Sequence, residues 1–303
     1  GINVFDNMYK LYLKSGTAGS KPMICSTVPK MKLNFIKALI TEDNAVGSTI
    51  FGIPFSNERY LNGSLSPNSS EVVRGDILDP ALYIADILTD NLKNIGVCVN
   101  GEPVCSRLLS QSGNALPQKR QNIITTYSPT LSEIIKVTNY FSSNLYADAL
   151  LKTIGTLYLK SDKSTTSFDK GIKVLKDFWK ERFINCNMIL YDGSGLAATN
   201  RITSEFVSEI LEYMATKSMY SEQFIHSLPT AGVSGNMKNF LHDTCLQGNA
   251  KLKGGSMTKV QCYAGYIQKG EKRYAVGIFA NNYYCEPQKV KKAIEEILID
   301  LFS

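Results

Sequence analysis

The pattern of apolar residues after Asn249 constrains the fold more than any other feature of the 303-residue chain. Two runs of strand-forming residues, VQCYAGYIQ and RYAVGIFANNYY, are separated by Lys-Gly-Glu-Lys, a sequence typical of a hairpin turn. The chain then ends in PQKVKKAIEEILIDLFS, which predicts an amphipathic helix begun by Pro287. A hairpin followed by a helix with one apolar face predicts an antiparallel sheet covered by helices.

Amphipathic helices are also predicted upstream of this hairpin, and together they place the C-terminal half in the α+β class. Thr203 or Ser204 is expected to cap the fourth of them, and Ser167 stands where an N-cap of the third is expected. The predicted helices span residues 130–141, 144–155, 168–184 and 202–217.

The N-terminal part has a different composition. Residues 1–75 combine short apolar runs with Gly and Pro, which predicts several short strands, and Val4, Met8, Leu11 and Leu13 are apolar among polar neighbours. A helix is predicted from Asp79-Pro80 to Gly96, followed by a strand, a turn and a strand in VCVNGEPVC (97–105).

The polar segment SQSGNALPQKRQ (110–121) predicts a domain boundary that extends to about residue 125. We therefore expect a β-rich region at 1–125 and an α+β region at 126–303.

Charge and composition exclude several function classes. The net charge of +6 comes from dispersed lysines without a long basic run, so the sequence does not favour a nucleic-acid partner. No stretch approaches the ~20 continuous apolar residues of a transmembrane segment, and the first residues do not form an export signal. With two histidines and no Cys-x-x-Cys, neither a metal site nor a cofactor is expected; Cys98 and Cys105 are close enough in sequence to bridge a short loop.

Ser142 and Asn144 are the first candidates for a binding pocket. On one continuous helix they would point about 200° apart, but a break between two helices lets both face one pocket. Ser and Asn favour helix ends, which supports such a break; a plain helix cap is the alternative.

Lys253-Gly254-Gly255 is the second candidate. On a strand, Lys253 and Gly255 share a face, so the lysine can hold a carboxylate while the glycines let a peptide approach the backbone. A glycine bulge or turn is the alternative.

Two further segments have mainly structural interpretations. Asp192-Gly193-Ser194-Gly195 predicts a tight turn closed by the aspartate, and its register differs from that of a Gly-x-Ser-x-Gly nucleophile elbow. Ser167 and Lys170 have the spacing of a serine and its lysine base, although Ser167 also opens a predicted helix and is interpreted as its N-cap.

Four segments in order carry a family resemblance: SPTLSEIIKVTNYFSSNLYADALLKTIG, YDGSGLAATNRIT, SLPTAGVSGNMKN and LKGGSMTKVQCYAGYI. Together they resemble the D-alanyl-D-alanine carboxypeptidase/endopeptidase family, the class C low-molecular-mass penicillin-binding proteins. The similarity covers most of residues 70–282.

The resemblance implies a penicillin-binding transpeptidase-like (β-lactamase-like) domain, an antiparallel sheet flanked by helices. Residues 1–125 would be mostly a β-rich inserted region, and 126–303 the C-terminal part of the catalytic domain. It also implies a serine peptidase that is periplasmic or otherwise exported and binds peptidoglycan peptides or β-lactams.

The resemblance also implies roles for single residues. Ser142 and Asn144 match Ser-x-Asn, and Lys253 and Gly255 match the first and third places of Lys-Thr-Gly, which makes Ser142, Asn144 and Lys253 the catalytic candidates. The implied substrate-binding residues are Gly254, Gly255 and Ser256.

Two departures from the family pattern leave the enzymatic activity open. No Ser-x-x-Lys precedes Ser142, because Pro29 stands three residues after Ser26, and Gly254 replaces the threonine of Lys-Thr-Gly. The chain is then either a piece of an exported family member whose Ser-x-x-Lys segment lies upstream, or a non-catalytic relative that binds cell-wall peptide or a protein partner. A β-lactamase is a weaker third interpretation. On either of the first two, the chain as given is not expected to form an acyl-enzyme by the family route.

Overall fold

The computed structural model describes residues 2–115, 121–158, 165–183 and 186–303. Within these ranges the chain divides into two compact units, Gly1–Ile124 and Thr125–Ser303. The predicted boundary segment 110–125 contains residues 116–120, which lie outside the described residues.

The second unit is built on a three-stranded antiparallel meander in the order β11-β10-β9. The strands are β9 (Ala250–Met257), β10 (Val260–Lys269) and β11 (Lys272–Asn281). The predicted hairpin turn is confirmed, because β10 and β11 are joined only by Gly270 and Glu271, and Gly270 has a left-handed φ of 60°. A small pair, β7 (Met188–Ile189) with β8 (Arg201–Ile202), lies apart from this sheet.

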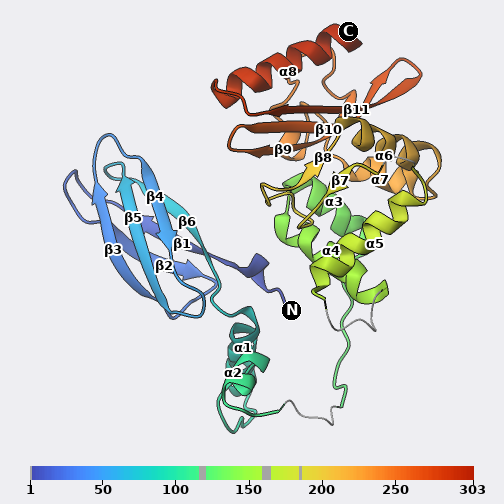
Figure 1. Cartoon of the computed structure of the whole chain (residues 1–303). Helices are drawn as coiled ribbons and strands as arrows, with labels where there is room; N and C mark the ends of the chain where they lie inside the picture. The colour runs from blue at the N-terminus through green and yellow to red at the C-terminus, as the bar shows by residue number, and fades with distance from the viewer. Residues whose placement is uncertain (1, 116–120, 159–164, 184–185) are drawn as a thin grey trace. The chain divides into compact units, whose positions relative to one another are not determined.

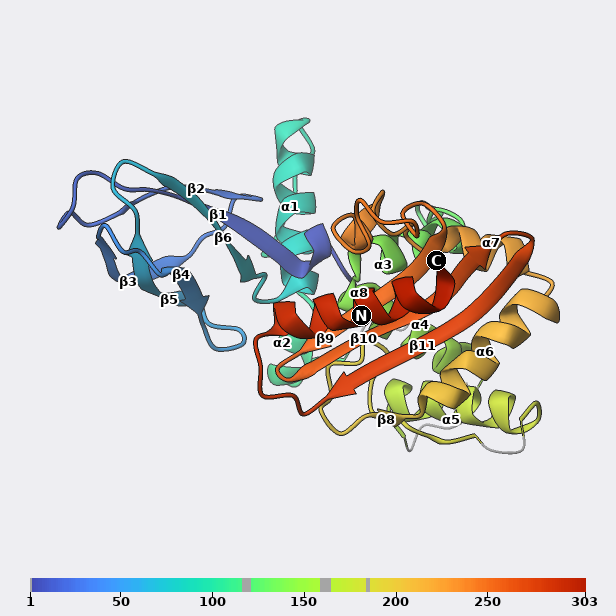
Figure 2. The ribbon, with the colours of Figure 1, turned by 90° about the horizontal axis from the view of Figure 1, so that it is seen from above.

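Helices cover both faces of the meander, as Figures 1 and 2 show. The terminal helix begins at Pro287 as predicted and packs on one face, where Ile294 and Leu298 meet Tyr263 and Ile267. On the other face Tyr266 packs among helical residues and donates its hydroxyl to the carbonyl of Leu211 at 2.6 Å. The helices of this unit are α3 (Leu131–Phe141), α4 (Asn144–Tyr158), α5 (Ser167–Lys180), α6 (Ser204–Thr216), α7 (Ser221–Ser227) and α8 (Pro287–Phe302).

The helix predictions hold in position and differ at their ends. Thr203 caps α6, since its hydroxyl accepts from the N–H of Phe206. The interpretation of Ser167 as an N-cap was wrong: Thr166 is the extended residue, and it forms a capping box with Asp169. Residue 184, the predicted end of this helix, lies outside the described residues.

The first unit is a β-sandwich followed by two helices (Figure 1). One sheet has the order β2-β1-β6, and the other has the order β3-β5-β4 with β3 and β5 parallel. Its elements are a short 3-10 turn (Phe5–Asn7), β1 (Met8–Lys14), β2 (Met23–Val28), β3 (Asn34–Thr41), β4 (Gly47–Phe51), β5 (Glu58–Leu65), β6 (Ser70–Asp76), α1 (Pro80–Asn94) and α2 (Ser106–Gln111).

Three details of the first unit differ from the sequence-based expectations. Strand β1 buries Tyr9, Leu11 and Leu13, whereas Met8 is on the opposite face and exposed. The segment CVNGEPVC contains no strand, and its two cysteines are free thiols.

The predicted N-cap at Asp79 is confirmed, because its carboxylate accepts from the N–H of Leu82.

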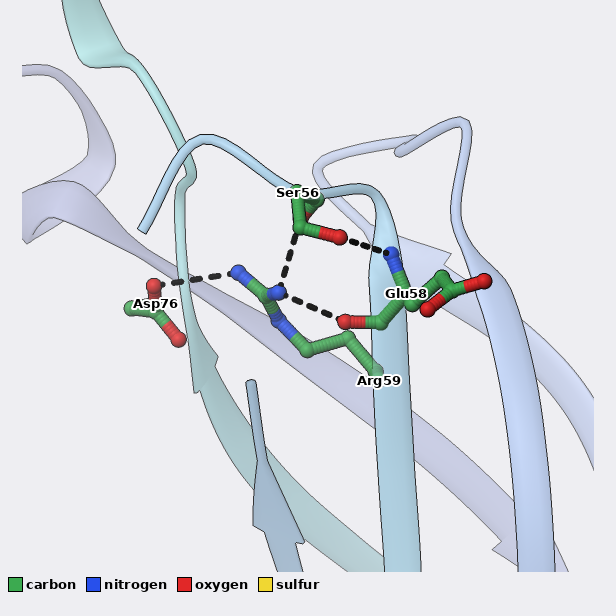
Figure 3. A network of polar contacts seen from close by, with 4 residues as sticks. All are labelled: Ser56, Glu58, Arg59 and Asp76. Atoms are coloured by element: carbon green, nitrogen blue, oxygen red, sulfur yellow. Dashed lines mark hydrogen bonds and ion pairs between the residues drawn. The ribbon is translucent and has the colours of Figure 1, made fainter. Parts of the chain in front are cut away.

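A fully buried arginine closes one end of the sandwich (Figure 3). Arg59 donates to the carbonyls of Ser56 and Glu58 at 2.9 and 2.8 Å, and it pairs with Asp76 at 3.1 Å. Gly52 makes room for the guanidinium, since a Cβ there would lie 2.2 Å from one of its nitrogens. Because 64 % of the Asp76 side chain is exposed, solvent screens the ion pair, so we expect burial and the carbonyl contacts to contribute more than the charge pair does.

Replacement of Arg59 by Met keeps most of the apolar stem and removes the donors to both carbonyls. We expect a loss of about 2–3 kcal/mol in the stability of this unit, against less than about 1 kcal/mol for Asp76→Asn. The single Trp of the chain is Trp179, in the other unit, so hydrogen exchange over residues 8–14 and 58–65 is the appropriate measurement. Arg74→Met, at an exposed arginine of β6, is the control, and an equal loss for Asp76→Asn would show that the ion pair dominates.

Candidate active site

A break between α3 and α4 presents Ser142 and Asn144 to the same cleft. Ser142 follows the last residue of α3 and has left-handed dihedrals (φ 52°, ψ 50°), while its N–H donates to the carbonyl of Thr138. The next helix begins at Asn144. A left-handed serine costs about 1–2 kcal/mol, so surrounding contacts must stabilise it. This is the helix break that the sequence predicted, and both side chains line the cleft.

Lys253 of β9 provides such a contact. Its ammonium donates to the hydroxyl oxygen of Ser142 at 2.8 Å and also contacts the carbonyl of Gly254. Ser142 and Lys253 are 111 positions apart in the sequence, so this bond joins the helical layer to the sheet. Burial lowers the pKa of Lys253 below its ordinary 10.5.

The outer edge of β9 is covered only in its first half. Ala231 and Leu252 make backbone hydrogen bonds with the carbonyls of Ala250 and Pro229, respectively, at 2.8 and 3.0 Å. Farther along the strand, the residues that follow Lys253 line the cleft instead: Gly254, Gly255, Ser256, Met257 and Thr258. This segment therefore offers an extended backbone on which a peptide can dock.

Gly254 marks the place where the cleft differs from the Lys-Thr-Gly pattern. A Cβ at this position would lie 2.7 Å from the terminal methyl of Met237 and 3.3 Å from the ring of Tyr263. A β-carbon added at residue 254 would therefore collide with the terminal methyl of Met237 unless that side chain moved. At Gly255 a Cβ would meet nothing within 4 Å.

The Asp-Gly-Ser-Gly turn forms another wall. Asp192 accepts from the N–H groups of Gly195 and Ala197 and from the Asn200 amide, so the predicted aspartate-closed turn is confirmed. Burial acts to raise the pKa of Asp192, but these hydrogen bonds outweigh it and lower that pKa. The N–H of Gly193 donates to Asp148 of α4 at 2.9 Å, which fixes the turn against the helix that carries Asn144.

The cleft has a volume of about 950 Å³ and includes residues that sequence reasoning did not assign to it. Phe240 and Tyr263 stack at 3.9 Å between ring centroids, and burial raises the pKa of Tyr263 to about 12. The family resemblance rests in part on the segment SLPTAGVSGNMKN, but the sequence does not indicate which of its residues line the cleft. The additional lining residues include Ser194, Leu196, Asn236, Met237, Asn239, Phe240, Gln261, Tyr263, Tyr283 and Lys291.

Ser167 and Lys170 lie elsewhere. They are in the first turn of α5, where the carbonyl of Ser167 approaches Gly155 of α4, and neither belongs to the cleft lining. Among the described residues no group of three His, Cys, Asp or Glu side chains is placed to hold a metal ion. In the same part of the chain, no helix has the length and apolar character needed to cross a membrane.

Comparison with known proteins agrees with this geometry. The model of the D-Ala-D-Ala carboxypeptidase 3 (S13) family matches residues 2–301. The chain belongs to this family. The match runs through both units.

Curated relatives include penicillin-sensitive carboxypeptidase A of Dictyostelium discoideum, which is 27 % identical over 80 % of this chain and 47 % of its own length. D-alanyl-D-alanine carboxypeptidase DacB of Haemophilus influenzae is 31 % identical over 66 % of this chain and 40 % of its own length. The chain thus spans about half the length of the curated relatives it matches.

Among solved structures, penicillin binding protein 4 (dacB) from Haemophilus influenzae, in complex with a β-lactam, gives a TM-score of 0.79 at 21 % identity. The match covers 99 % of this chain and 70 % of that one. The likeness confirms the penicillin-binding transpeptidase-like fold, α+β with an antiparallel sheet.

The buried ammonium of Lys253 gives a pH-dependent prediction. In the unfolded chain this lysine titrates near 10.5 and in the folded chain at a lower pH, so between the two values the unfolded state binds more protons and stability rises with pH. Lys253→Met removes this dependence, so the stability difference between variant and wild type should shift in favour of the wild type from pH 7 to pH 10. Urea unfolding followed by Trp179 fluorescence measures it.

Lys251→Met is the matched control, because Lys251 is on the same strand and outside the cleft lining. A pH dependence unchanged by Lys253→Met would contradict the prediction.

Proposed function

We propose that this chain forms the peptide-binding half of the active site of a serine-type D-Ala-D-Ala carboxypeptidase or endopeptidase that acts on peptidoglycan peptides. The single observation that supports this most strongly is the 2.8 Å contact between the Lys253 ammonium and the Ser142 hydroxyl at the base of the cleft. Family membership supports the same activity class.

The contact supports a proton-transfer role for Ser142. Because the ammonium donates to the Ser142 oxygen, the hydroxyl hydrogen is free to donate toward the cleft. A hydroxyl held in this way can accept and pass on a proton when a peptide bond is cleaved through an acyl-enzyme. Lys253 fixes the direction of the hydroxyl and compensates negative charge nearby.

Asn144 and β9 are proposed to hold the substrate. The Asn144 amide offers both a donor and an acceptor to a peptide group. The segment Gly254–Ser256 offers backbone groups to an extended peptide, and the open space at Gly255 permits close approach. Among the described residues the Lys253 ammonium has two hydrogen-bond acceptors, so its third donor is available to a carboxylate.

The substitution at Gly254 favours a second candidate, a relative that binds cell-wall peptide or a protein partner without catalysis. A threonine there would bring a hydroxyl to the cleft, and a hydrogen bond to a charged group contributes about 1.5–3 kcal/mol. The loss of this hydroxyl weakens the binding of a terminal carboxylate.

The proposed site of action is outside the cytoplasm, where peptidoglycan and β-lactams are encountered.

Gly254→Thr tests the carboxylate site. The terminal methyl of Met237 must shift, which is inexpensive for a flexible side chain, so we expect the variant to fold and to bind an N-acetylated peptide ending in D-Ala-D-Ala about tenfold more tightly. Gly254→Val has the same shape without the hydroxyl and should not gain affinity. Calorimetric titration measures both.

The same peptide ending in L-Ala-L-Ala is the ligand control. Equal binding of the two stereoisomers by the wild type would contradict the proposed substrate class.

Penicillin tests the non-catalytic candidate and the binding role of the cleft. Because no Ser-x-x-Lys precedes Ser142, we expect intact-protein mass spectrometry to show no penicillin adduct on this 303-residue chain, while penicillin protects the cleft against hydrogen exchange. A covalent adduct would refute the non-catalytic candidate, and peptide mapping would then identify the nucleophile. Ser142→Ala serves as the control for the cleft, and its protection should be weaker.

A further inference from the structure

The charged residues that line the cleft are all of one sign. Among its described lining residues only Lys253 and Lys291 carry a charge, and there is no carboxylate. Lys253 comes from β9 and Lys291 from the second turn of α8, so the two ammonium groups belong to different layers of the unit. A cleft with two cations and no acid attracts a ligand with negative charge.

Lys291 is held in place by neutral groups. Its ammonium donates to the carbonyl of Asn239 at 2.6 Å and lies 6.0 Å from the centre of the Phe240 ring. Asn239 and Phe240 themselves line the cleft. The carbonyl uses one of the three ammonium donors, so two remain for a ligand.

Two acids of α8 that lie close to Lys291 in sequence are engaged elsewhere. Glu295, one turn farther along α8, accepts from the N–H of Leu241 at 2.8 Å. Glu296 pairs with Lys292. The ion pairs of the described residues do not include Lys291, so its charge is not neutralised by a carboxylate of this unit.

We propose that Lys291 forms a second anion subsite, which selects peptides that carry an acidic side chain upstream of the terminal residues bound near Lys253. The inference rests on the proposed peptide-binding function and specifies its substrate class as an acidic peptide. Phe240 and Tyr263, which stack on each other next to the cleft, are almost fully buried, so the intervening part of the peptide is held by the polar and backbone groups of the lining.

The test uses N-acetylated pentapeptides that end in D-Ala-D-Ala. One Glu is placed at each of the three preceding positions in turn, and each peptide is matched by the same sequence with Gln. We expect the wild-type chain to bind at least one Glu peptide about tenfold more tightly than its Gln partner, since a charge-assisted hydrogen bond is gained. The preference should decrease as salt is raised.

Lys291→Met should abolish the Glu preference, so that each Glu peptide binds no more tightly than its Gln partner, whereas Lys291→Arg should preserve the preference. Lys292→Met is the matched control, because Lys292 is adjacent on α8, exposed and outside the cleft lining. It should retain the preference. Trp179 fluorescence in urea verifies that each variant is folded.

The outcomes separate the two proposals. If the wild type binds every Glu peptide and its Gln partner equally, the subsite is refuted and the peptide-binding function stands. If Lys291→Met loses affinity for the Glu and Gln peptides equally, the subsite is also refuted, because Lys291 would then not discriminate charge. If the wild type binds no peptide of the set, the proposed function fails and this inference fails with it.

Discussion

The hydrogen bond between Lys253 and Ser142 is the contact on which the arrangement of the cleft depends. It requires a lysine on the face of β9 turned toward the helices and a serine at a break between α3 and α4. The break costs conformational energy and the burial of an ammonium costs solvation energy, and the hydrogen bond between the two residues offsets part of both costs. Two locally unfavourable features placed together at the base of one cleft are characteristic of a functional site.

Local sequence rules predicted those parts of the fold that depend on neighbours in the chain. Pro287 begins the last helix and Gly270 turns the hairpin, because both residues restrict or permit backbone conformations directly. Ser142 and Asn144 were placed at a helix break for the same reason, namely their poor fit to helix interiors. In these cases the physical cause acts within a few residues.

Predictions failed where contacts distant in sequence decide between similar neighbours. The N-cap of α5 is an exception with a local cause, because Thr166 rather than Ser167 forms the capping box with Asp169, three residues farther on. Met8 and Tyr9 are adjacent on β1, and the sandwich buries Tyr9. Lys291 resembled any lysine of an amphipathic helix, and only the packing of α8 against the sheet brings it to the cleft. Tertiary packing, which local patterns do not encode, settles the burial of Tyr9 and the position of Lys291.

Gly254 shows that residues on the two faces of β9 can change independently. The face of β9 that carries Lys253 keeps its contact with Ser142, whereas the opposite face, at Gly254, meets Met237 and Tyr263. Replacement of a threonine by glycine therefore removes a hydroxyl without disturbing the ammonium, because alternate residues of a strand point to opposite faces. With that hydroxyl absent, the electrostatic attraction of an anionic peptide depends on the two lysines of the cleft lining, Lys253 and Lys291, and its retention depends on the backbone of β9.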